Sequence, residues 1–212
     1  DTDARNNLWR AVAYACHPDA WGVQIVFDNQ VILGTRARKT RTKSFNAFSS
    51  IDYPETAMFR DRRLIQFLQR PADYTHAVFS TALDPNVFVL RLVPGMRADT
   101  IPLLEGRYRA LVLESFGVGG LPGGDDGAMF AAVRDWCGAG HLAVFTTQVP
   151  HEGSDLAVYE VGRAAKALPG VLEAHDMTPE ATAVKLMWVL GQTTDRAEAE
   201  KLFLTPVQWD IL

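Results

Sequence analysis

Apolar side chains near the start of the chain recur first with the spacing of a helix and then with that of paired strands. Residues 8–16 place apolar side chains at i, i+3, i+4 and i+7, which predicts an amphipathic helix with Asp3 as its cap. Residues 22–27 and 31–33 are strand-like, and the turn signal Asp28-Asn29 separates them. The pattern therefore predicts a helix followed by a β-hairpin.

The pattern weakens from Ser49 to about Pro85, where little sustained periodicity separates one turn signal from the next. The turn signals are Tyr53-Pro54, Arg70-Pro71-Ala72-Asp73 and Asp84-Pro85-Asn86. We expect this stretch to be a linker segment.

Beyond this stretch, apolar runs of strand length alternate with helical patterns. Strands are predicted over residues 87–93, 110–113 and 142–147, and helices over 98–104, 126–136, 178–191 and 195–203. Thr178 supplies a capping hydroxyl and Pro179 stands at the first helical position. This alternation predicts a doubly wound α/β domain with a parallel sheet, whose ligands gather beyond the carboxyl ends of the strands.

Composition narrows the class of protein further. The 212 residues are 48% hydrophobic and 22% charged, as in an ordinary soluble globular protein. A net charge of -4 gives no global attraction to nucleic acid or to an anionic membrane. The start shows no signal-peptide pattern and no apolar run approaches the roughly 18 residues of a membrane span, so we expect a cytoplasmic protein.

The two cysteines, Cys16 and Cys137, lie far apart and outside any CxxC pair, which predicts buried thiols. The five histidines are scattered, His76 and His151 among them, so no metal site is expected. The chain also opens directly into a helix with no leading strand, which suggests a fragment boundary.

Basic residues cluster after the hairpin. They are Arg36, Arg38, Lys39, Arg41 and Lys43. The cluster fits either a solvated basic loop or a catalytic lysine, and the catalytic alternative requires burial, because desolvation lowers the pKa of an amine and makes it a base at neutral pH. The cluster alone does not select one lysine.

A glycine-rich segment, residues 114–124, follows a predicted strand. The sixth position counted from Gly117 is Pro122, and no G-K-[ST] follows, so both nucleotide-binding fingerprints fail on spacing. Two interpretations of the segment remain: it is a tight structural turn, or its backbone approaches a ligand or another subunit closely. A polar loop over residues 148–155 follows the third strand and runs to Tyr159-Glu160, without the G-x-S-x-G of a serine hydrolase.

Several ordered segments together resemble the asparaginase family, particularly its cytoplasmic bacterial and archaeal branch. They are residues 2–8 (TDARNNL), 38–48 (RKTRTKSFNAF), 115–119 (SFGVG), 158–163 (VYEVGR) and 176–181 (DMTPEA). Their order and spacing extend over almost the whole chain. The resemblance implies residues 1–70 as the end of an N-terminal α/β domain, 71–86 as a linker and 87–212 as a smaller C-terminal doubly wound parallel α/β domain.

The resemblance also implies hydrolysis of L-asparagine, or of L-glutamine, without metal or cofactor, in a homodimer or homotetramer with sites shared between subunits. Family enzymes use a threonine nucleophile in T-G-G-T and a second threonine in G-T-D, held with an aspartate and a lysine. That lysine falls on Lys39, as general base. Gly120 stands where many members carry an asparagine that contacts substrate from a neighbouring subunit, so that contact is either lost or passed to backbone. Glu160 would hold the substrate amino group from the adjacent subunit.

Three departures limit what is carried over. No T-G-G-T occurs, and the context of Thr2-Asp3 matches a helix opening rather than G-T-D. About a third of a family chain would thus lie before Asp1, and the 212 residues alone are expected to be inactive. Glu114 replaces an arginine implicated in allosteric asparagine binding, so that route of activation is not supported.

Two alternatives remain open. One is the asparaginase-like subunit of a tRNA-dependent amidotransferase, which would carry an extra N-terminal domain. The other is a non-catalytic module that binds an amino acid or supports dimerisation.

Overall fold

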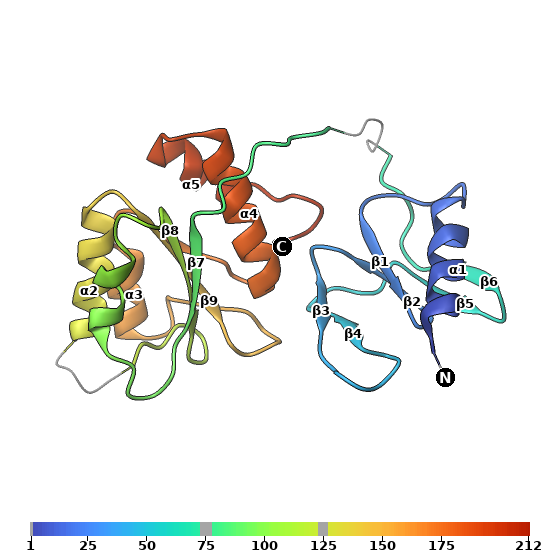
Figure 1. Ribbon diagram of the computed structural model, residues 1–212, viewed down its shortest axis with the longest axis horizontal. Helices are drawn as coiled ribbons and strands as arrows, with labels where there is room; N and C mark the ends of the chain where they lie inside the picture. The colour runs from blue at the N-terminus through green and yellow to red at the C-terminus, as the bar shows by residue number, and fades with distance from the viewer. Residues whose placement is uncertain (1, 73–77, 123–126) are drawn as a thin grey trace. The chain divides into compact units, whose positions relative to one another are not determined.

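The computed structural model describes residues 2–72, 78–122 and 127–212 and divides the chain into two compact units (Figure 1). The N-terminal unit is Asp1–Ser80 and the C-terminal unit is Thr81–Leu212. The expected linker over 71–86 includes residues 73–77, which lie outside the described residues, so its limits stay a prediction.

The N-terminal unit consists of one helix and two antiparallel sheets. Helix α1 (Ala4–Ala15) precedes a four-stranded sheet of order β1-β2-β5-β6 and a two-stranded sheet of β3 and β4. The strands are β1 (Gln24–Phe27), β2 (Gln30–Leu33), β3 (Ala37–Lys39), β4 (Phe48–Ser50), β5 (Ala57–Arg60) and β6 (Arg63–Gln66). A small core joins α1 to the larger sheet through Tyr14, Val31, Ala57 and Phe59.

The predicted helix and hairpin are confirmed, and polar side chains tie them together. Asp28 begins the turn with φ 54° and donates its N–H to Asn7 Oδ1 at 2.9 Å. Arg10 donates to the carbonyl oxygen of Asp28 at 2.6 Å. Asp3 occupies the cap position, but its carboxylate accepts from Asn7 Nδ2 at 2.9 Å and makes no capping bond to the backbone.

The linker expected from Ser49 to about Pro85 is wrong over its first half, because β4, β5 and β6 lie there. β5 and β6 form a hairpin in which Arg60 pairs with Arg63 around a two-residue turn. Both turn residues, Asp61 and Arg62, have positive φ, which a primed turn requires and which asparagine or glycine usually supplies. The hairpin therefore lacked its usual sequence signal.

The C-terminal unit is an α/β fold around a four-stranded parallel sheet of order β10-β9-β8-β7, as predicted (Figure 1). The strands are β7 (Val87–Arg91), β8 (Ala110–Ser115), β9 (Leu142–Thr147) and β10 (Val171–Glu173). The helices are η1 (Ala98–Thr100), η2 (Pro102–Leu104), α2 (Ala128–Gly138), α3 (Glu160–Lys166), α4 (Pro179–Gln192) and α5 (Arg196–Leu204). Residue 126, where a helix was expected to begin, lies outside the described residues.

Helices cover both faces of this sheet, which explains its continuous apolar strands. Leu111 and Leu113 pack with α2 on one face, whereas Ala110 and Val112 pack with α4 and α5 on the other. In Figure 1, α2 and α3 lie on one side of the strands and α4 and α5 on the other. The single helix expected over 98–104 is two 3-10 turns, because Pro102 lacks the N–H that an α-helix would use.

The tail folds as predicted and is held by two helix caps and a buried ion pair. The Thr178 hydroxyl caps α4 by accepting from Ala181 N–H, and Asp195 caps α5 by accepting from Glu198 N–H at 2.8 Å. Lys185 Nζ contacts Asp210 Oδ2 at 2.8 Å, with both side chains almost fully buried. Burial lowers the pKa of Lys185. The hydrogen bond to Asp210 and its negative charge raise this pKa, but burial has the larger effect.

The two cysteines differ in their exposure to solvent. Cys137 is buried, and burial raises the pKa of its thiol to about 11. Cys16 is exposed at the end of α1, so the expectation of two buried thiols is wrong for this residue.

Candidate active site

Lys39 ends β3, in a short antiparallel pair with β4. Its backbone pairs with Phe48, and its Nζ lies 5.9 Å from the centroid of the Phe48 ring. The side chain is exposed among the described residues. The pair is anchored by Arg36, which is fully buried and whose carbonyl accepts from Ile51 N–H at 2.9 Å.

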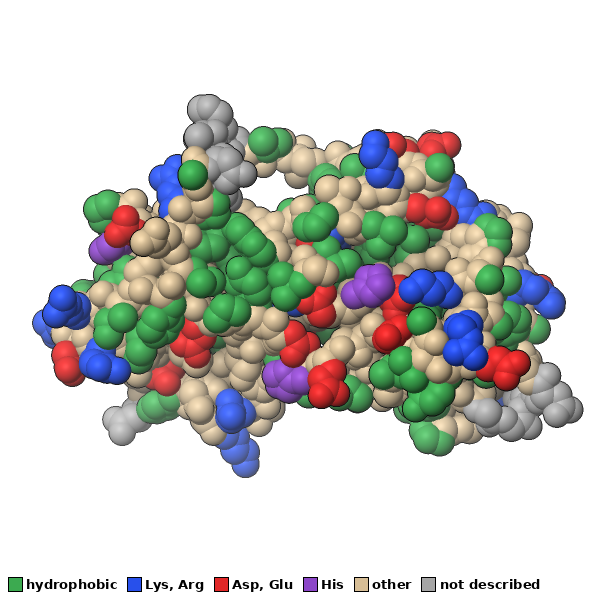
Figure 2. Space-filling view, turned by 180° about the vertical axis from the view of Figure 1, so that it is seen from behind, with side chains coloured by type: hydrophobic (Ala, Val, Ile, Leu, Met, Phe, Trp, Pro, Cys, Tyr) green, Lys and Arg blue, Asp and Glu red, His purple; other side chains and the backbone are tan. Residues whose placement is uncertain are grey.

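The residues of the basic cluster therefore differ in burial, and Arg38 is half-buried. Arg36 packs in the interior with its guanidinium carbon 5.6 Å from the Tyr53 ring centroid, whereas Lys39, Arg41 and Lys43 are exposed. On the face shown in Figure 2, basic and acidic side chains are interspersed rather than gathered by sign. On this face the arrangement favours no extended nucleic-acid surface.

The glycine-rich segment forms a closed turn at the carboxyl end of β8. Phe116 and Gly120 exchange backbone hydrogen bonds of 3.0 and 2.7 Å. Gly117 has φ 50°, and Gly119 has φ 147° and a position where a Cβ would lie 2.5 Å from Leu156 Cδ2. The backbone of this turn at Gly119 thus lies close to the Leu156 side chain of the same unit. Gly120 is half-buried, and Gly123 and Gly124 lie outside the described residues.

The polar loop after β9 is tied to the same edge of the sheet. Gln148 donates through Nε2 to the carbonyl oxygens of Leu92 and Glu114, at 2.5 and 2.8 Å. Thr147 Oγ1 donates to the carbonyl oxygen of Gly117 at 2.5 Å. Glu160 follows as the first residue of α3, with its side chain exposed.

The structure therefore brings Gly120 and Glu160 to the carboxyl edge of one parallel sheet, where ligands of such sheets gather. Lys39 belongs to the N-terminal unit. Sequence reasoning missed Glu173, a nearly buried carboxylate at the end of β10 that lies at the same edge. Its only sequence signal is an acidic residue that closes an apolar strand.

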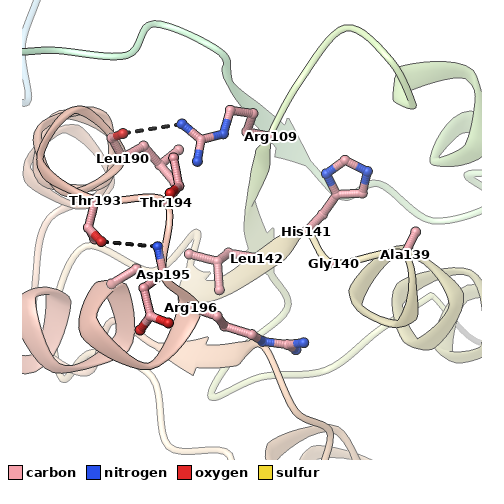
Figure 3. A pocket seen from close by; sticks show the side chains of 11 residues that line it. Arg109, Ala139, Gly140, His141, Leu142, Leu190, Thr193, Thr194, Asp195 and Arg196 are labelled. Carbon is pink, nitrogen blue, oxygen red and sulfur yellow. Dashed lines mark hydrogen bonds between the residues drawn. The ribbon is translucent and has the colours of Figure 1, made fainter.

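A hollow of about 220 Å³ lies at the opposite, amino edge of the sheet (Figure 3). Arg109 and His141 contribute side chains from beside β8 and β9, and Thr193 to Arg196 line it from the α4–α5 connection. Arg109 is already engaged, donating to Asp84 Oδ2 at 2.7 Å and to the Leu190 carbonyl at 3.2 Å. The hollow contains none of the predicted site residues.

Neither a metal-binding cluster nor a membrane-spanning helix is found in the part of the chain that the structure describes. In residues 2–72, 78–122 and 127–212, no three His, Cys, Asp or Glu residues gather where they could hold a metal ion. No helix in the same ranges is both long enough and apolar enough to cross a bilayer.

Among solved structures, the fold is similar to that of amide-hydrolysing enzymes of the L-asparaginase type. The thermostable L-asparaginase from Thermococcus kodakarensis superposes with a TM-score of 0.91 at 34% identity, over 100% of this chain and 63% of that one. Residues 1–72 match the family described as "Asparaginase, N-terminal", and residues 86–203 match "Glutaminase/Asparaginase C-terminal domain". The chain belongs to the asparaginase family.

Two relatives show the range of that family. An L-asparaginase of Thermococcus kodakarensis is 37% identical over 203 residues, which are 95% of this chain and 60% of the relative. A subunit of the Glutamyl-tRNA(Gln) amidotransferase of Metallosphaera sedula is 33% identical over 178 residues, 81% of this chain and 39% of the relative. The chain therefore spans less than two thirds of the length of either protein.

Proposed function

We propose that these 212 residues are the larger part of an L-asparaginase, which hydrolyses L-asparagine, or L-glutamine, to the acid and ammonia. The observation that carries the proposal is the match of both asparaginase domains, in order, together with 37% identity to an L-asparaginase over 95% of the chain. The nucleophilic threonine and its G-T-D partner would lie outside these residues. We further propose a cytoplasmic enzyme that works as a dimer or tetramer.

In this proposal Lys39 is the general base. Its neutral amine accepts the proton of a threonine hydroxyl as the hydroxyl oxygen attacks the side-chain amide carbon of the substrate. The lysine ammonium returns this proton to the amide nitrogen, which leaves as ammonia. Water then hydrolyses the ester between the acyl group and the threonine, which releases the acid and restores the threonine hydroxyl. A lysine base needs cover from solvent, which the described residues do not give to Lys39, so residues outside this chain would supply it. Gly120, through its backbone, and Glu160 would contact the substrate.

Ammonia release by a longer protein, extended to include T-G-G-T and G-T-D, tests this function. Lys39→Met should lower kcat by about 10² or more if the amine is the base. Lys43→Met, which removes a second exposed amine from the same segment, is the matched control and should keep kcat within about twofold. An unchanged kcat in Lys39→Met, or ammonia release by the 212 residues alone, would contradict the proposal.

An amidotransferase component is a second candidate, supported by the 33% identity to the Metallosphaera sedula protein. The same assay separates the two. An asparaginase turns over free asparagine by itself, whereas an amidotransferase component would release ammonia efficiently only with its partner protein and charged tRNA. A pocket discriminates asparagine from glutamine, one methylene apart, by only about 1–3 kcal/mol, so both amides belong in the assay.

A further inference from the structure

Residues 153–156 lie between two loops at the carboxyl edge of the parallel sheet. Ser154 donates its backbone N–H to the carbonyl oxygen of His175, which follows β10, at 2.8 Å. Asp155 donates its N–H to the carbonyl oxygen of Val118, in the glycine-rich turn after β8, at 2.8 Å. The segment therefore connects the ends of two strands that are not neighbours in the sheet.

Glycines allow this segment to be approached closely on several sides. A Cβ at Gly153 would lie 2.4 Å from the carbonyl oxygen of His175, and one at Gly162 of α3 would lie 2.5 Å from that of Leu156. Gly119 makes the same kind of approach to the Leu156 side chain, which is 1% exposed. Leu156 is thus enclosed by the turn, by α3 and by the apolar layer beneath.

Glu173 supplies the buried charge at the centre of this arrangement. Its Oε1 accepts the Leu156 N–H at 2.7 Å, and its Oε2 accepts from Lys166 Nζ, in the last turn of α3, at 2.8 Å. His175 Nδ1 lies 3.8 Å from the same Oε2. The Glu173 side chain is 3% exposed and that of Lys166 is 49% exposed. A carboxylate buried to this extent is tolerated only with such partners, so it strongly favours the arrangement that provides them.

The geometry points to Glu173 as a positioning residue that fixes the 153–156 segment and, through it, both proposed substrate contacts. Gly120 closes the turn that Asp155 and Leu156 hold, and Glu160 opens α3, which Lys166 and Gly162 hold. The Glu173 carboxylate acts on these two contacts indirectly, since it meets Leu156, Lys166 and His175. The part of this inference that concerns substrate rests on the proposed function.

Hydrogen exchange of the full 212-residue chain tests the structural half without any activity. Glu173→Ala should speed exchange at the Leu156 amide by about tenfold or more, because a charge-assisted hydrogen bond is lost, and should leave the central β8 and β9 amides unchanged. Glu173→Gln keeps the volume and an acceptor oxygen for Leu156, and should give a smaller increase. Glu105→Gln, an exposed glutamate, is the matched control and should change nothing at Leu156.

Kinetics of the longer protein test the other half. Glu173→Ala and Glu173→Gln should raise KM for asparagine, by about tenfold in the alanine variant, with kcat within about threefold, because substrate contacts move while the base stays in place. If Glu173→Ala does not fold, Glu173→Gln decides alone. Unchanged exchange at Leu156 in the folded variants, or a fall in kcat with unchanged KM, overturns the positioning role. A wild-type protein that fails to turn over asparagine overturns the proposed function instead and leaves the exchange result standing.

Discussion

The two units differ in how helices cover their sheets. The N-terminal unit pairs short antiparallel strands and packs one helix, α1, on a small core around Tyr14 and Phe59. The C-terminal unit encloses a parallel sheet between two helical layers, so that Leu111 and Val112 are both buried although they point to opposite faces. Because its sheet is covered on both faces, the C-terminal unit should hold most of the stability and also shows the clearer sequence pattern.

Removal of a core phenylalanine from each unit should give the largest effect and the most direct test. Phe145→Ala should destabilise the C-terminal unit by about 4 kcal/mol, because the ring is fully buried in the apolar layer between sheet and helix and its removal leaves a cavity that the surroundings fill only in part. Phe59→Ala should destabilise the N-terminal unit by about 3 kcal/mol or less, since that core can relax more freely. Hydrogen exchange on peptides of each unit in graded denaturant measures both.

Phe145→Leu controls for loss of the ring alone and should be milder, at about 1.5 kcal/mol or less. A larger loss from Phe59→Ala than from Phe145→Ala would reverse the comparison between the units.

The next largest effect concerns the buried ion pair of the C-terminal unit. Asp210→Asn should destabilise by about 3 kcal/mol, because the ammonium of Lys185 stays buried without its counter-charge. Burial already lowers the pKa of Lys185, so the folded variant binds fewer protons than the unfolded chain, and the deficit should shrink as the pH rises towards the ordinary lysine pKa of 10.5. Denaturant unfolding at several pH values measures this trend.

An exposed pair in the N-terminal unit is the control for that experiment. Asp19, whose carboxylate lies 3.7 Å from His17 Nδ1, is well exposed, and Asp19→Asn should change stability by less than about 0.5 kcal/mol. For the buried pair, the double variant Lys185→Met with Asp210→Leu should recover most of the stability lost in Asp210→Asn, since it leaves neither charge of the pair. A deficit of Asp210→Asn that grows with pH would refute this account of Lys185 and Asp210.

The smallest effect compares two helix caps. Asp195→Ala should destabilise α5 by about 1 kcal/mol, because its carboxylate accepts the Glu198 N–H. Asp3→Ala should change stability by less than about 0.5 kcal/mol, because the Asp3 carboxylate binds the Asn7 side chain rather than the backbone. Thermal unfolding of the two variants suffices, and equal losses would show that Asp3 does cap α1 in solution.

The sequence predicts the C-terminal unit better than the N-terminal unit, and within it the long buried elements better than the short ones. The predicted and observed limits of β9 coincide, because both of its faces are buried and its apolar residues, Leu142 to Phe145, are followed by two threonines, which also favour strands. Helix α3 was missed because its buried positions are Gly162 and Ala165 while Val161 is exposed, which leaves no apolar stripe. β10 was missed because three residues are too short to show a period.

The candidate site could be predicted only where a resemblance carried it. Lys39, Gly120 and Glu160 came from ordered family motifs, and their roles stay predictions. Glu173 could not be found that way, because its importance lies in burial and in contacts to Leu156 and Lys166, 17 and 7 residues away along the chain. A sequence pattern reports the residue type but not the partners that a fold brings to it.

The glycines inside two helices limit how this protein can be engineered for heat resistance. Exchange of a helical glycine for alanine is a standard stabilising change, because it reduces the freedom of the unfolded chain. At Gly162 the added methyl would meet the Leu156 carbonyl, and at Gly191 it would lie 2.4 Å from the carbonyl oxygen of Ala82. These positions should therefore resist the exchange, whereas Gly138, the last residue of α2, has nothing within 4 Å of an added Cβ and should accept it.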